Sequence, residues 1–381
     1  MRNRLQYFSL VIILLITSHA SAQKSRADRI TAALEPDIKA VMETAKIPSC
    51  TVALVDGDQI VWQKAYGYTN LWSKSPAQLD SVYLIGSTFK AMAAMALLQL
   101  MEQGKFKLDD PVNQYLGDIK IKGEDPKNPV TFRQVLAHVS GMPGDFGPFP
   151  LWGDEAPPKL EDYMRSSLRV ERPPLEKEVY SNMGYSMIGY LVEKLSGKPF
   201  KTYVREEIFT PLEMKDTDFN PRPDMDERMA FPYVPDEKTG ELKPFMKLRA
   251  TVWPAGLVYG TIGDQANWLI ANLNGGTFKG KRFVTDATHT EMLKPQFEKF
   301  KGPVEKLWGG PEANFGLTWW VEDRGGEKYF AHSGSVPGYT AFLLGNRTRR
   351  LGFAILTNGN RSHPHLIKIA DKAIEILKTE K

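Results

Sequence analysis

The chain has 381 residues, of which 42% are hydrophobic and 25% are charged, and these values are typical of a globular protein. Lysine and arginine number 49 against 45 aspartates and glutamates, and no block of five like charges occurs. The composition therefore excludes a disordered or fibrous chain, and the missing basic stripe argues against nucleic acid as a partner. A chain of this length buries enough surface to fold without a disulfide or a structural metal.

The first segment predicts a secretory signal peptide over residues 1–22. Two arginines come first, an apolar run from Leu10 to Ile16 follows, and the small residues Ala20–Ala22 end the segment. The run is too short to cross a bilayer, which needs about 20 apolar residues. We expect cleavage after Ala22, a secreted or periplasmic protein of residues 23–381, and no stable membrane insertion afterwards. The alternative is an uncleaved membrane anchor.

A helix and a hairpin are predicted at the start of the mature chain. Apolar residues at helical spacing predict the helix over residues 30–45, with a kink or a restart at Pro36. Two strand-like runs, 50–55 and 59–68, flank an Asp-Gly pair that is typical of a tight hairpin turn. The single cysteine, Cys50, begins the first run, so we expect a small buried core residue rather than a nucleophile.

The middle and the end of the chain differ in pattern. Residues 91–103 predict a buried helix rich in Ala, Met and Leu that ends at Gly104. From 108 to 225, helical segments alternate with loops, notably 142–158. Strand-like runs at short spacing then precede a closing amphipathic helix over residues 367–378. These runs are 316–323, 328–332, 339–346 and 350–357.

Strands at both ends of the chain, with helices between them, predict an α/β (α+β) fold. We expect one antiparallel sheet built from both chain ends, flanked by the terminal helices, with an all-helical lobe inserted. The α/β lobe would comprise about residues 28–90 and 226–381. The helical lobe would comprise about residues 91–225, within a single domain of residues 23–381.

Ser87 and Lys90 are the first candidates for chemistry. They stand three positions apart at the start of the helix over residues 91–103, so both side chains project from one face of its first turn. Burial disfavours the ammonium form of a lysine, and the neutral amine can then act as a base toward the serine hydroxyl. The alternative for Ser87 is an ordinary helix cap.

A second cluster is Tyr180-Ser181-Asn182, which precedes a predicted helix over residues 184–195. Tyr180 could transfer a proton near neutral pH if adjacent positive charge lowered its pKa. The amide of Asn182 could donate to a substrate carbonyl while accepting a hydrogen bond from Lys90. The alternative is a loop with a helix cap.

A third cluster, His332-Ser333-Gly334, ends a strand-like run and is followed by Ser335. If this strand borders the pocket, the backbone NH of Ser335 could pair with that of Ser87 as an oxyanion hole. We therefore expect His332, Gly334 and Ser335 on the substrate-binding side, although alone His332 would be an ordinary hydrogen-bonded histidine. The histidines form no recognised metal-ligand pattern and no nucleotide-binding glycine fingerprint occurs, so we expect neither a metal nor a cofactor.

The order and spacing of the three clusters resemble the motifs of the penicillin-recognising serine hydrolases, specifically their class C β-lactamase-like branch. This branch includes class C β-lactamases, D-alanyl-D-alanine peptidases, D-aminopeptidases and family VIII esterases. The resemblance runs from about Asp28 to the C-terminus and implies an α/β lobe and a helical lobe with the site between them. Supporting segments occur in the same order at Leu108–Val112, His138–Pro143, Pro254–Leu257 and Phe315–Trp320.

The resemblance also implies a role for each matching residue. Ser87 looks like the acylated nucleophile, and Lys90 and Tyr180 look like the proton-transfer pair. Asn182 is similar to the amide that binds substrate and orients the lysine. His332 departs from the pattern, because β-lactamases of this branch usually carry lysine there, whereas histidine is mostly neutral at pH 7. This departure favours a peptidase or an esterase over a β-lactamase.

The residues and the resemblance together predict a serine hydrolase that forms an acyl-enzyme on Ser87 and cleaves an ester or a D-amino-acid-type amide. Its partner would be a small-molecule or peptide substrate. Two alternatives stay open: a class C-like β-lactamase, and a penicillin-binding-like protein that keeps the fold without turnover. A lid formed by residues 142–158 is a further open hypothesis.

Overall fold

The computed structural model describes residues 25–144, 159–246 and 253–380. The expected signal peptide and its cleavage site lie outside the described residues, as does most of the loop 142–158. Among the described helices, none combines the length and the apolar character that a membrane crossing requires.

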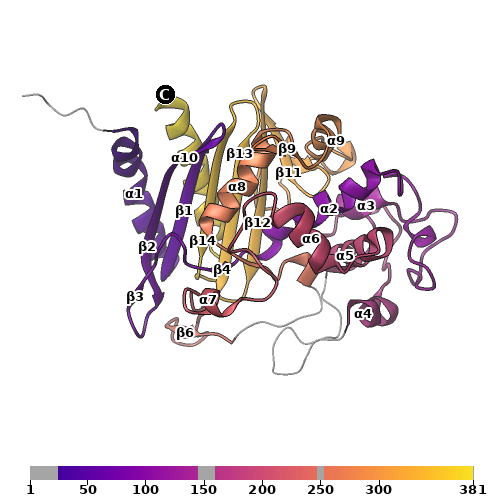
Figure 1. Ribbon diagram of the computed structural model, residues 1–381, viewed down its shortest axis with the longest axis horizontal. Coiled ribbons are helices and arrows are strands. Elements are labelled where there is room, and N and C mark those ends of the chain that lie inside the picture. The colour runs from indigo at the N-terminus through magenta and orange to yellow at the C-terminus, as the bar shows by residue number, and fades with distance from the viewer. Residues whose placement is uncertain (1–24, 145–158, 247–252, 381) are drawn as a thin grey trace, which may run out of the picture.

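One eight-stranded antiparallel sheet forms the centre of the molecule (Figure 1). Its strand order is β10-β11-β12-β13-β14-β1-β2-β3, so strands from the two ends of the chain meet where β14 pairs with β1. This confirms the predicted sheet. The strands are β1 (Ser49–Asp56), β2 (Gln59–Asn70), β3 (Ser75–Pro76), β10 (Asn314–Phe315), β11 (Trp320–Arg324), β12 (Glu327–Val336), β13 (Tyr339–Asn346) and β14 (Leu351–Thr357).

Two predicted strands have different bounds in the structure. The run 316–323 was wrong at its start, because Thr318 has φ +85° and the extended strand β11 begins only at Trp320. The run 328–332 was too short, since β12 continues to Val336, which pairs with Tyr339 of β13. Pairing with a neighbouring strand extends β12 through a Ser-Gly-Ser sequence that has little strand preference of its own.

Helices cover both faces of the sheet (Figure 1). The terminal helices α1 (Arg26–Thr44) and α10 (His363–Thr379) pack together on one face, and α8 (Ile262–Leu273) covers the other. Side chains alternate along β1, so Leu54 belongs to the core under the terminal helices and Val55 to the core under α8. Helix α1 runs through Pro36, so of the two alternatives that we considered, a kink or a restart, the restart does not occur.

A helical region lies beside one end of the sheet (Figure 1). Its central helix, α2, is buried along almost its whole length and packs against α5. The 3-10 turn η1 (Gly86–Phe89) leads directly into α2. The helices of this region are α2 (Lys90–Glu102), α3 (Phe132–Leu136), α4 (Leu160–Ser167), α5 (Asn182–Ser196) and α6 (Phe200–Val204).

Short elements connect the helical region to the sheet. The two-stranded pairs are β4 (Tyr83–Leu84) with β7 (Tyr259–Gly260), β5 (Tyr233–Pro235) with β6 (Leu242–Pro244), and β8 (Thr277–Phe278) with β9 (Lys281–Arg282). Two further short α-helices are α7 (Pro223–Asp226) and α9 (Asp286–Met292). Because β4 runs into η1, the β4–β7 pair fixes the approach of the chain to Ser87.

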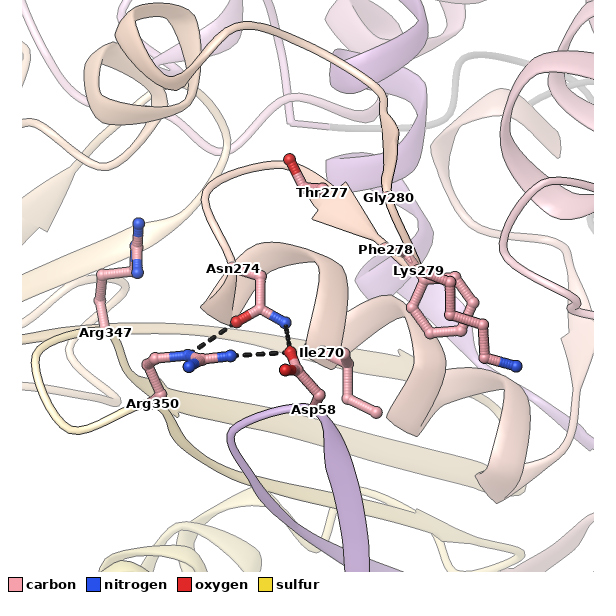
Figure 2. A pocket seen from close by; sticks show the side chains of 9 residues that line it. All are labelled: Asp58, Ile270, Asn274, Thr277, Phe278, Lys279, Gly280, Arg347 and Arg350. Carbon is pink, nitrogen blue, oxygen red and sulfur yellow. Dashed lines mark hydrogen bonds and ion pairs between the residues drawn. The ribbon is translucent and has the colours of Figure 1, made fainter.

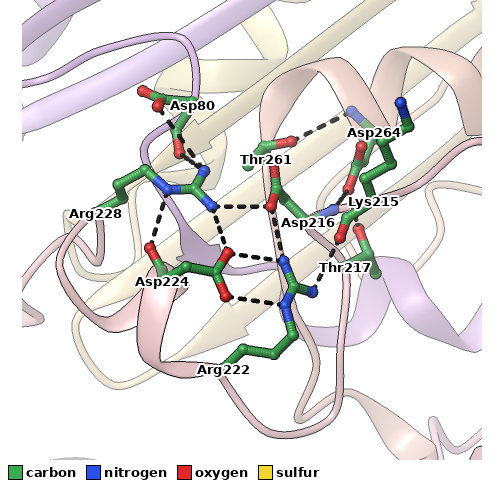
Figure 3. A network of polar contacts seen from close by, with 9 residues as sticks. All are labelled: Asp80, Lys215, Asp216, Thr217, Arg222, Asp224, Arg228, Thr261 and Asp264. Carbon is green, nitrogen blue, oxygen red and sulfur yellow. Dashed lines mark hydrogen bonds and ion pairs between the residues drawn. The ribbon is translucent and has the colours of Figure 1, made fainter.

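A network of ion pairs holds the segment around α7 against α8 (Figure 3). Asp216 accepts hydrogen bonds from Arg222 at 3.1 Å and from Arg228 at 2.8 Å. Both guanidinium groups also contact Asp224, at 2.9 and 3.3 Å. The backbone NH of Asp216 donates in turn to Asp264 in the first turn of α8, at 2.9 Å. Backbone and side chains therefore connect these two elements.

Candidate active site

The free edge of β12 creates the place for the site. Strand β11 pairs with β12 only as far as Ala331, so residues 332–336 pair with β13 on one side alone among the described strands. The turn η1 packs against this stretch of β12. The structure thus brings the first and third sequence clusters together across the sheet edge.

Glycines allow the two backbones to approach closely at this edge. A Cβ atom on Gly334 would lie 2.1 Å from the carbonyl oxygen of Ile85 and 3.1 Å from the amide nitrogen of Ser87. A Cβ atom on Gly86, which has φ +55°, would lie 2.8 Å from the amide nitrogen of Ser335. Larger residues do not fit either position. The amide nitrogens of Ser87 and Ser335 therefore lie beside the same pair of glycines.

The side chain of Lys90 points at the hydroxyl of Ser87. Ser87 lies within η1 and Lys90 begins α2, and Lys90 Nζ is 2.9 Å from Ser87 Oγ. The amine also donates to Asn182 Oδ1 at 2.7 Å and to the carbonyl of Ala255 at 2.6 Å. Ser87 lies inside η1, and the N-cap positions of η1 and α2 are Ile85 and Phe89, so Ser87 is not the ordinary helix cap that we considered.

Burial sets the protonation state of Lys90. The side chain has no exposed surface, and the three atoms that accept its hydrogen bonds belong to a hydroxyl, an amide and a carbonyl, all neutral. Burial therefore lowers the pKa of Lys90 from 10.5 to about 7, and attraction to Glu305 opposes this shift. A large share of the molecules carries a neutral amine at Lys90 near pH 7, which is the form that a base requires.

Tyr180 lies beside this pair, but its pKa moves opposite to our expectation. Lys90 Nζ is 4.7 Å from the centroid of the Tyr180 ring, and the hydroxyl of Ser87 is close enough to the phenol to act on its pKa, which it lowers. Burial raises the pKa of Tyr180 well above 10, and the negative charge of Glu305 adds to the shift. The expected lowering by positive charge is therefore wrong, because desolvation outweighs a neighbouring amine that is itself partly neutral. The phenol stays protonated at neutral pH.

Asn182 is the first residue of α5 and reaches the same point. Its Oδ1 accepts the hydrogen bond from Lys90, and its Nδ2 donates to the carbonyl of Gly144 at 3.3 Å. The cap that we considered for this cluster exists as well, on Ser181, whose hydroxyl accepts from the backbone NH of Gly184 at 3.0 Å. The second cluster thus begins a helix and also contributes an amide to the site. A contact of Asn182 with substrate stays a prediction.

His332 lies under the site rather than on its surface. The ring is completely buried and stacks on Trp320 with centroids 5.7 Å apart. Its Nδ1 donates to the carbonyl of Ser333 at 2.7 Å, and burial lowers the pKa of His332 to about 3. The ring is therefore neutral and presents no cation to a substrate. Direct substrate binding by His332 stays a prediction.

Two contributors to the site were not found from the sequence. The carbonyl of Ala255 accepts a hydrogen bond from Lys90, and the carboxylate of Glu305 interacts electrostatically with Lys90 and Tyr180. Desolvation raises the pKa of Glu305 itself to about 7. Ala255 lies in the supporting segment Pro254–Leu257, to which the sequence assigned no role, and no local motif marks Glu305. Each acts on a partner that lies far away along the chain.

A pocket lies away from these residues, among α8, β8 and the turn between β13 and β14 (Figure 2). Its volume is about 610 Å³, and its lining includes Lys279, Arg347 and Arg350. Arg350 pairs with Asp58 at 2.7 Å, and Lys279 pairs with Glu213 at 2.6 Å. Since most of its cations are paired, we assign no ligand to it. Within the described ranges, no three His, Cys, Asp or Glu side chains gather as a metal site would require.

Comparison with known proteins places this chain in a family. The family model described as Beta-lactamase matches residues 34–378, which is most of the chain. The chain therefore belongs to the beta-lactamase family, and its fold is that of the family's serine hydrolases. The resemblance that the sequence motifs indicated is confirmed.

Among curated proteins, the chain is 24% identical over 336 residues to Protein flp of Staphylococcus aureus strain MW2. It is 28% identical over 337 residues to Unguisins hydrolase ungD' of Aspergillus campestris strain IBT 28561. Each match covers 86% of this chain, but only 63% and 61% of the respective relative. The chain thus spans less than two thirds of the length of these relatives.

Two solved structures share the fold. The octameric penicillin-binding protein homologue from Pyrococcus abyssi superimposes with a TM-score of 0.76 and 26% identity, over 92% of this chain and 77% of that one. The D-amino acid amidase from Ochrobactrum anthropi SV3, complexed with L-phenylalanine amide, gives a TM-score of 0.74 and 23% identity, over 93% and 99%. Both confirm the sheet with its helical insertion.

Proposed function

We propose that the protein is a secreted or periplasmic serine hydrolase that forms an acyl-enzyme on Ser87 and cleaves an ester or a D-amino-acid-type amide. The observation that carries this proposal is the 2.9 Å contact between Ser87 Oγ and the Nζ atom of Lys90, whose side chain is fully buried. A serine hydroxyl needs such a base, because the free alcohol is a weak nucleophile at neutral pH.

The proposed acylation uses the groups that the site brings together. The neutral amine of Lys90 takes the proton of Ser87 as Oγ bonds to the acyl carbon of the substrate. The carbonyl oxygen becomes an oxyanion between the backbone NH groups of Ser87 and Ser335, where each donor contributes roughly a hundredfold or more to the rate. The intermediate then expels the alcohol or amine, which leaves with a proton supplied through Lys90 and the phenol of Tyr180.

Hydrolysis of the acyl-enzyme repeats these steps with water as the nucleophile. Water gives one proton to the lysine–phenol pair, its oxygen bonds to the acyl carbon, and Ser87 Oγ leaves and regains a proton. The raised pKa of Tyr180 makes its phenol a proton donor to the leaving group rather than the resting base. Lys90 is the resting base.

The neutral ring at His332 supports an ester or amide substrate over a β-lactam. The position that carries lysine in the family's β-lactamases holds a buried histidine with a pKa of about 3. A substrate carboxylate therefore meets no fixed cation from this residue. The name of one relative, Unguisins hydrolase, agrees with hydrolytic chemistry.

The test compares the protein of residues 23–381 with its Ser87→Ala variant. Each is incubated with a short-chain nitrophenyl ester, a chromogenic cephalosporin and a D-Ala-D-Ala peptide, while product and protein mass are followed. We expect turnover of the ester or the peptide, a transient acyl adduct on the parent protein, and a loss of at least a thousandfold in Ser87→Ala. Ser166→Ala, which alters an exposed serine on α4, serves as the matched control and keeps full activity.

Each other result has a definite meaning. Turnover that survives in Ser87→Ala would contradict the proposal. A stable adduct without turnover would favour a penicillin-binding-like protein, and preferential cleavage of the cephalosporin would favour a β-lactamase.

A further inference from the structure

The backbone at His138 has a conformation that a histidine rarely adopts. Helix α3 ends in a Schellman motif, in which the NH of Val139 donates to Gln134 and the NH of His138 donates to Val135. The residue that follows such a helix end adopts left-handed dihedral angles, and His138 has φ +59°. Glycine or asparagine is favoured there, and other residues cost about 1 kcal/mol or more.

The side chain at this position is also costly to bury. His138 is 1% exposed, and burial together with the nearby Lys90 holds the pKa of His138 well below its ordinary value of 6.5. Its Nδ1 accepts a hydrogen bond, so the ring proton resides on Nε2, which has no hydrogen-bond partner among the described residues. Two local costs at one residue point to a role beyond filling space.

The contacts of His138 surround Tyr180. The backbone carbonyl of His138 accepts from the NH of Val179 at 2.9 Å, and its Nδ1 accepts from the NH of Ser181 at 3.0 Å. Between these two bonds, the imidazole stacks on the Tyr180 ring with centroids 4.3 Å apart and 28° between the planes. The other stacking partner is Tyr185, at 5.0 Å. His138 therefore holds the residue before Tyr180, the residue after it, and the ring itself.

We propose that His138 is a positioning residue that, through its hydrogen bond from Ser181, sets the phenol of Tyr180 against Ser87. The inference rests on the proposed function, because it concerns the proton transfer at that site. The imidazole touches no reacting atom. The bonds to His138 hold the backbone on both sides of Tyr180 before the reaction begins. Little conformational entropy is therefore lost when the phenol of Tyr180 is placed against Ser87.

Two variants separate the hydrogen bond from the stacked ring. His138→Asn removes the ring but keeps an oxygen near the position of Nδ1, and asparagine tolerates the left-handed backbone. His138→Phe keeps the ring but cannot accept from Ser181. We expect kcat to fall about ten- to a hundredfold in His138→Phe with little change in KM, and to stay within about fivefold of the parent in His138→Asn.

A double-mutant cycle shows whether His138 acts through Tyr180. In a Tyr180→Phe background there is no phenol to position, so we expect His138→Phe to change kcat by less than about threefold. Equal losses in both backgrounds, or an Asn variant as impaired as the Phe variant, would overturn the proposal. Failure of the proposed function would appear separately, as turnover that persists in Ser87→Ala.

His289→Phe is the matched control for loss of a buried histidine. His289 is also 1% exposed, and its Nε2 lies 3.3 Å from Asn272 Oδ1, away from the site. We expect this variant to lower stability without changing kcat of the folded protein. If His289→Phe lowered kcat as much as His138→Phe, the effect would be general loss of packing, and the proposal would be wrong.

Discussion

At the scale of single residues, the chemistry depends on the surroundings of one amine. Lys90 has three neutral hydrogen-bond acceptors and no exposed surface, and its pKa is lowered to about 7. The same side chain on a solvated helix would be an ammonium at neutral pH and could not take a proton from Ser87. Burial therefore converts an ordinary lysine into a base.

The first prediction concerns the pH dependence of the reaction. In the proposed mechanism the neutral form of Lys90 is the base, so kcat/KM should rise as the pH increases through about 7. The charge of Glu305 stabilises the ammonium of Lys90, so Glu305→Gln should move this acidic limb to lower pH, by about half a unit to one unit. The measurement is kcat/KM for a neutral nitrophenyl ester from pH 5 to 9.

Glu178→Gln is the control for this shift. Glu178 raises the pKa of Glu305 by repulsion, so its removal makes Glu305 more fully charged at neutral pH. The acidic limb of the kcat/KM profile should then stay in place or move slightly to higher pH. A limb that does not move to lower pH in Glu305→Gln would exclude this role for Glu305.

At the scale of elements, the start of α8 carries a carboxyl group that is unfavourably buried. Asp264 accepts from the NH of Asp216 and from the hydroxyl of Thr217, at 2.9 and 2.7 Å (Figure 3). These bonds and the nearby Arg222 lower its pKa, but desolvation is larger and raises the pKa from 3.8 to about 6. The folded state thus holds a proton on Asp264 that the unfolded state releases near pH 4.

The second prediction follows from the direction of that shift. A folded-state pKa above the unfolded value contributes stability that is complete below about pH 4 and is lost as the pH rises to about 6. Asp264→Asn removes the charge, so it should raise the free energy of unfolding at pH 8 by about 1–3 kcal/mol and change it little at pH 4. Urea unfolding at both pH values measures this difference.

Asp162→Asn provides the comparison. Asp162 also lies in the first turn of a helix, α4, but it is exposed to solvent. Its replacement should not raise the free energy of unfolding at pH 8, since an exposed carboxylate near a helix N-terminus is favourable. Equal gains in both variants would contradict the burial argument for Asp264.

At the scale of the whole molecule, one sheet joins the two ends of the chain. Every residue of β1 from Cys50 to Asp56 pairs with β14. The terminal helices α1 and α10 pack together and cover one and the same face of the sheet. The site at the edge of β12 therefore depends on a core that forms only when both ends have folded. Long-range pairing of this kind makes stability a property of the whole chain.

The third prediction tests that shared core. Ile374 of α10 is 1% exposed and belongs to the core between the terminal helices and the sheet. Ile374→Ala should lower the free energy of unfolding by about 2–5 kcal/mol, because it leaves a cavity. Ile367→Ala, on a partly buried position of the same helix, should cost clearly less. Chemical denaturation measures the free energy of unfolding of both variants. Equal losses in the two variants would show that this face of α10 is not part of a tightly packed core.

Local patterns accounted for much of the fold. Strand-like runs located β1, β2, β13 and β14, and the Asp-Gly pair marked the hairpin between β1 and β2, because strand composition and turn chemistry are properties of neighbouring residues. The same reasoning failed at β12, where pairing with β13 extends the strand to Val336. Partner strands contribute hydrogen bonds that a single strand's sequence does not show.

Part of the candidate site could likewise be predicted from local sequence, and part depends on the tertiary structure. One turn of helix makes Ser87 and Lys90 neighbours wherever that helix lies, so their contact was accessible from the sequence alone. The tertiary structure alone decided the burial that lowers the pKa of Lys90, the opposite shift of Tyr180, and the position of His332 beneath the site. A pKa depends on the solvent excluded and the charges brought near by distant segments, and those are known only once the chain has folded.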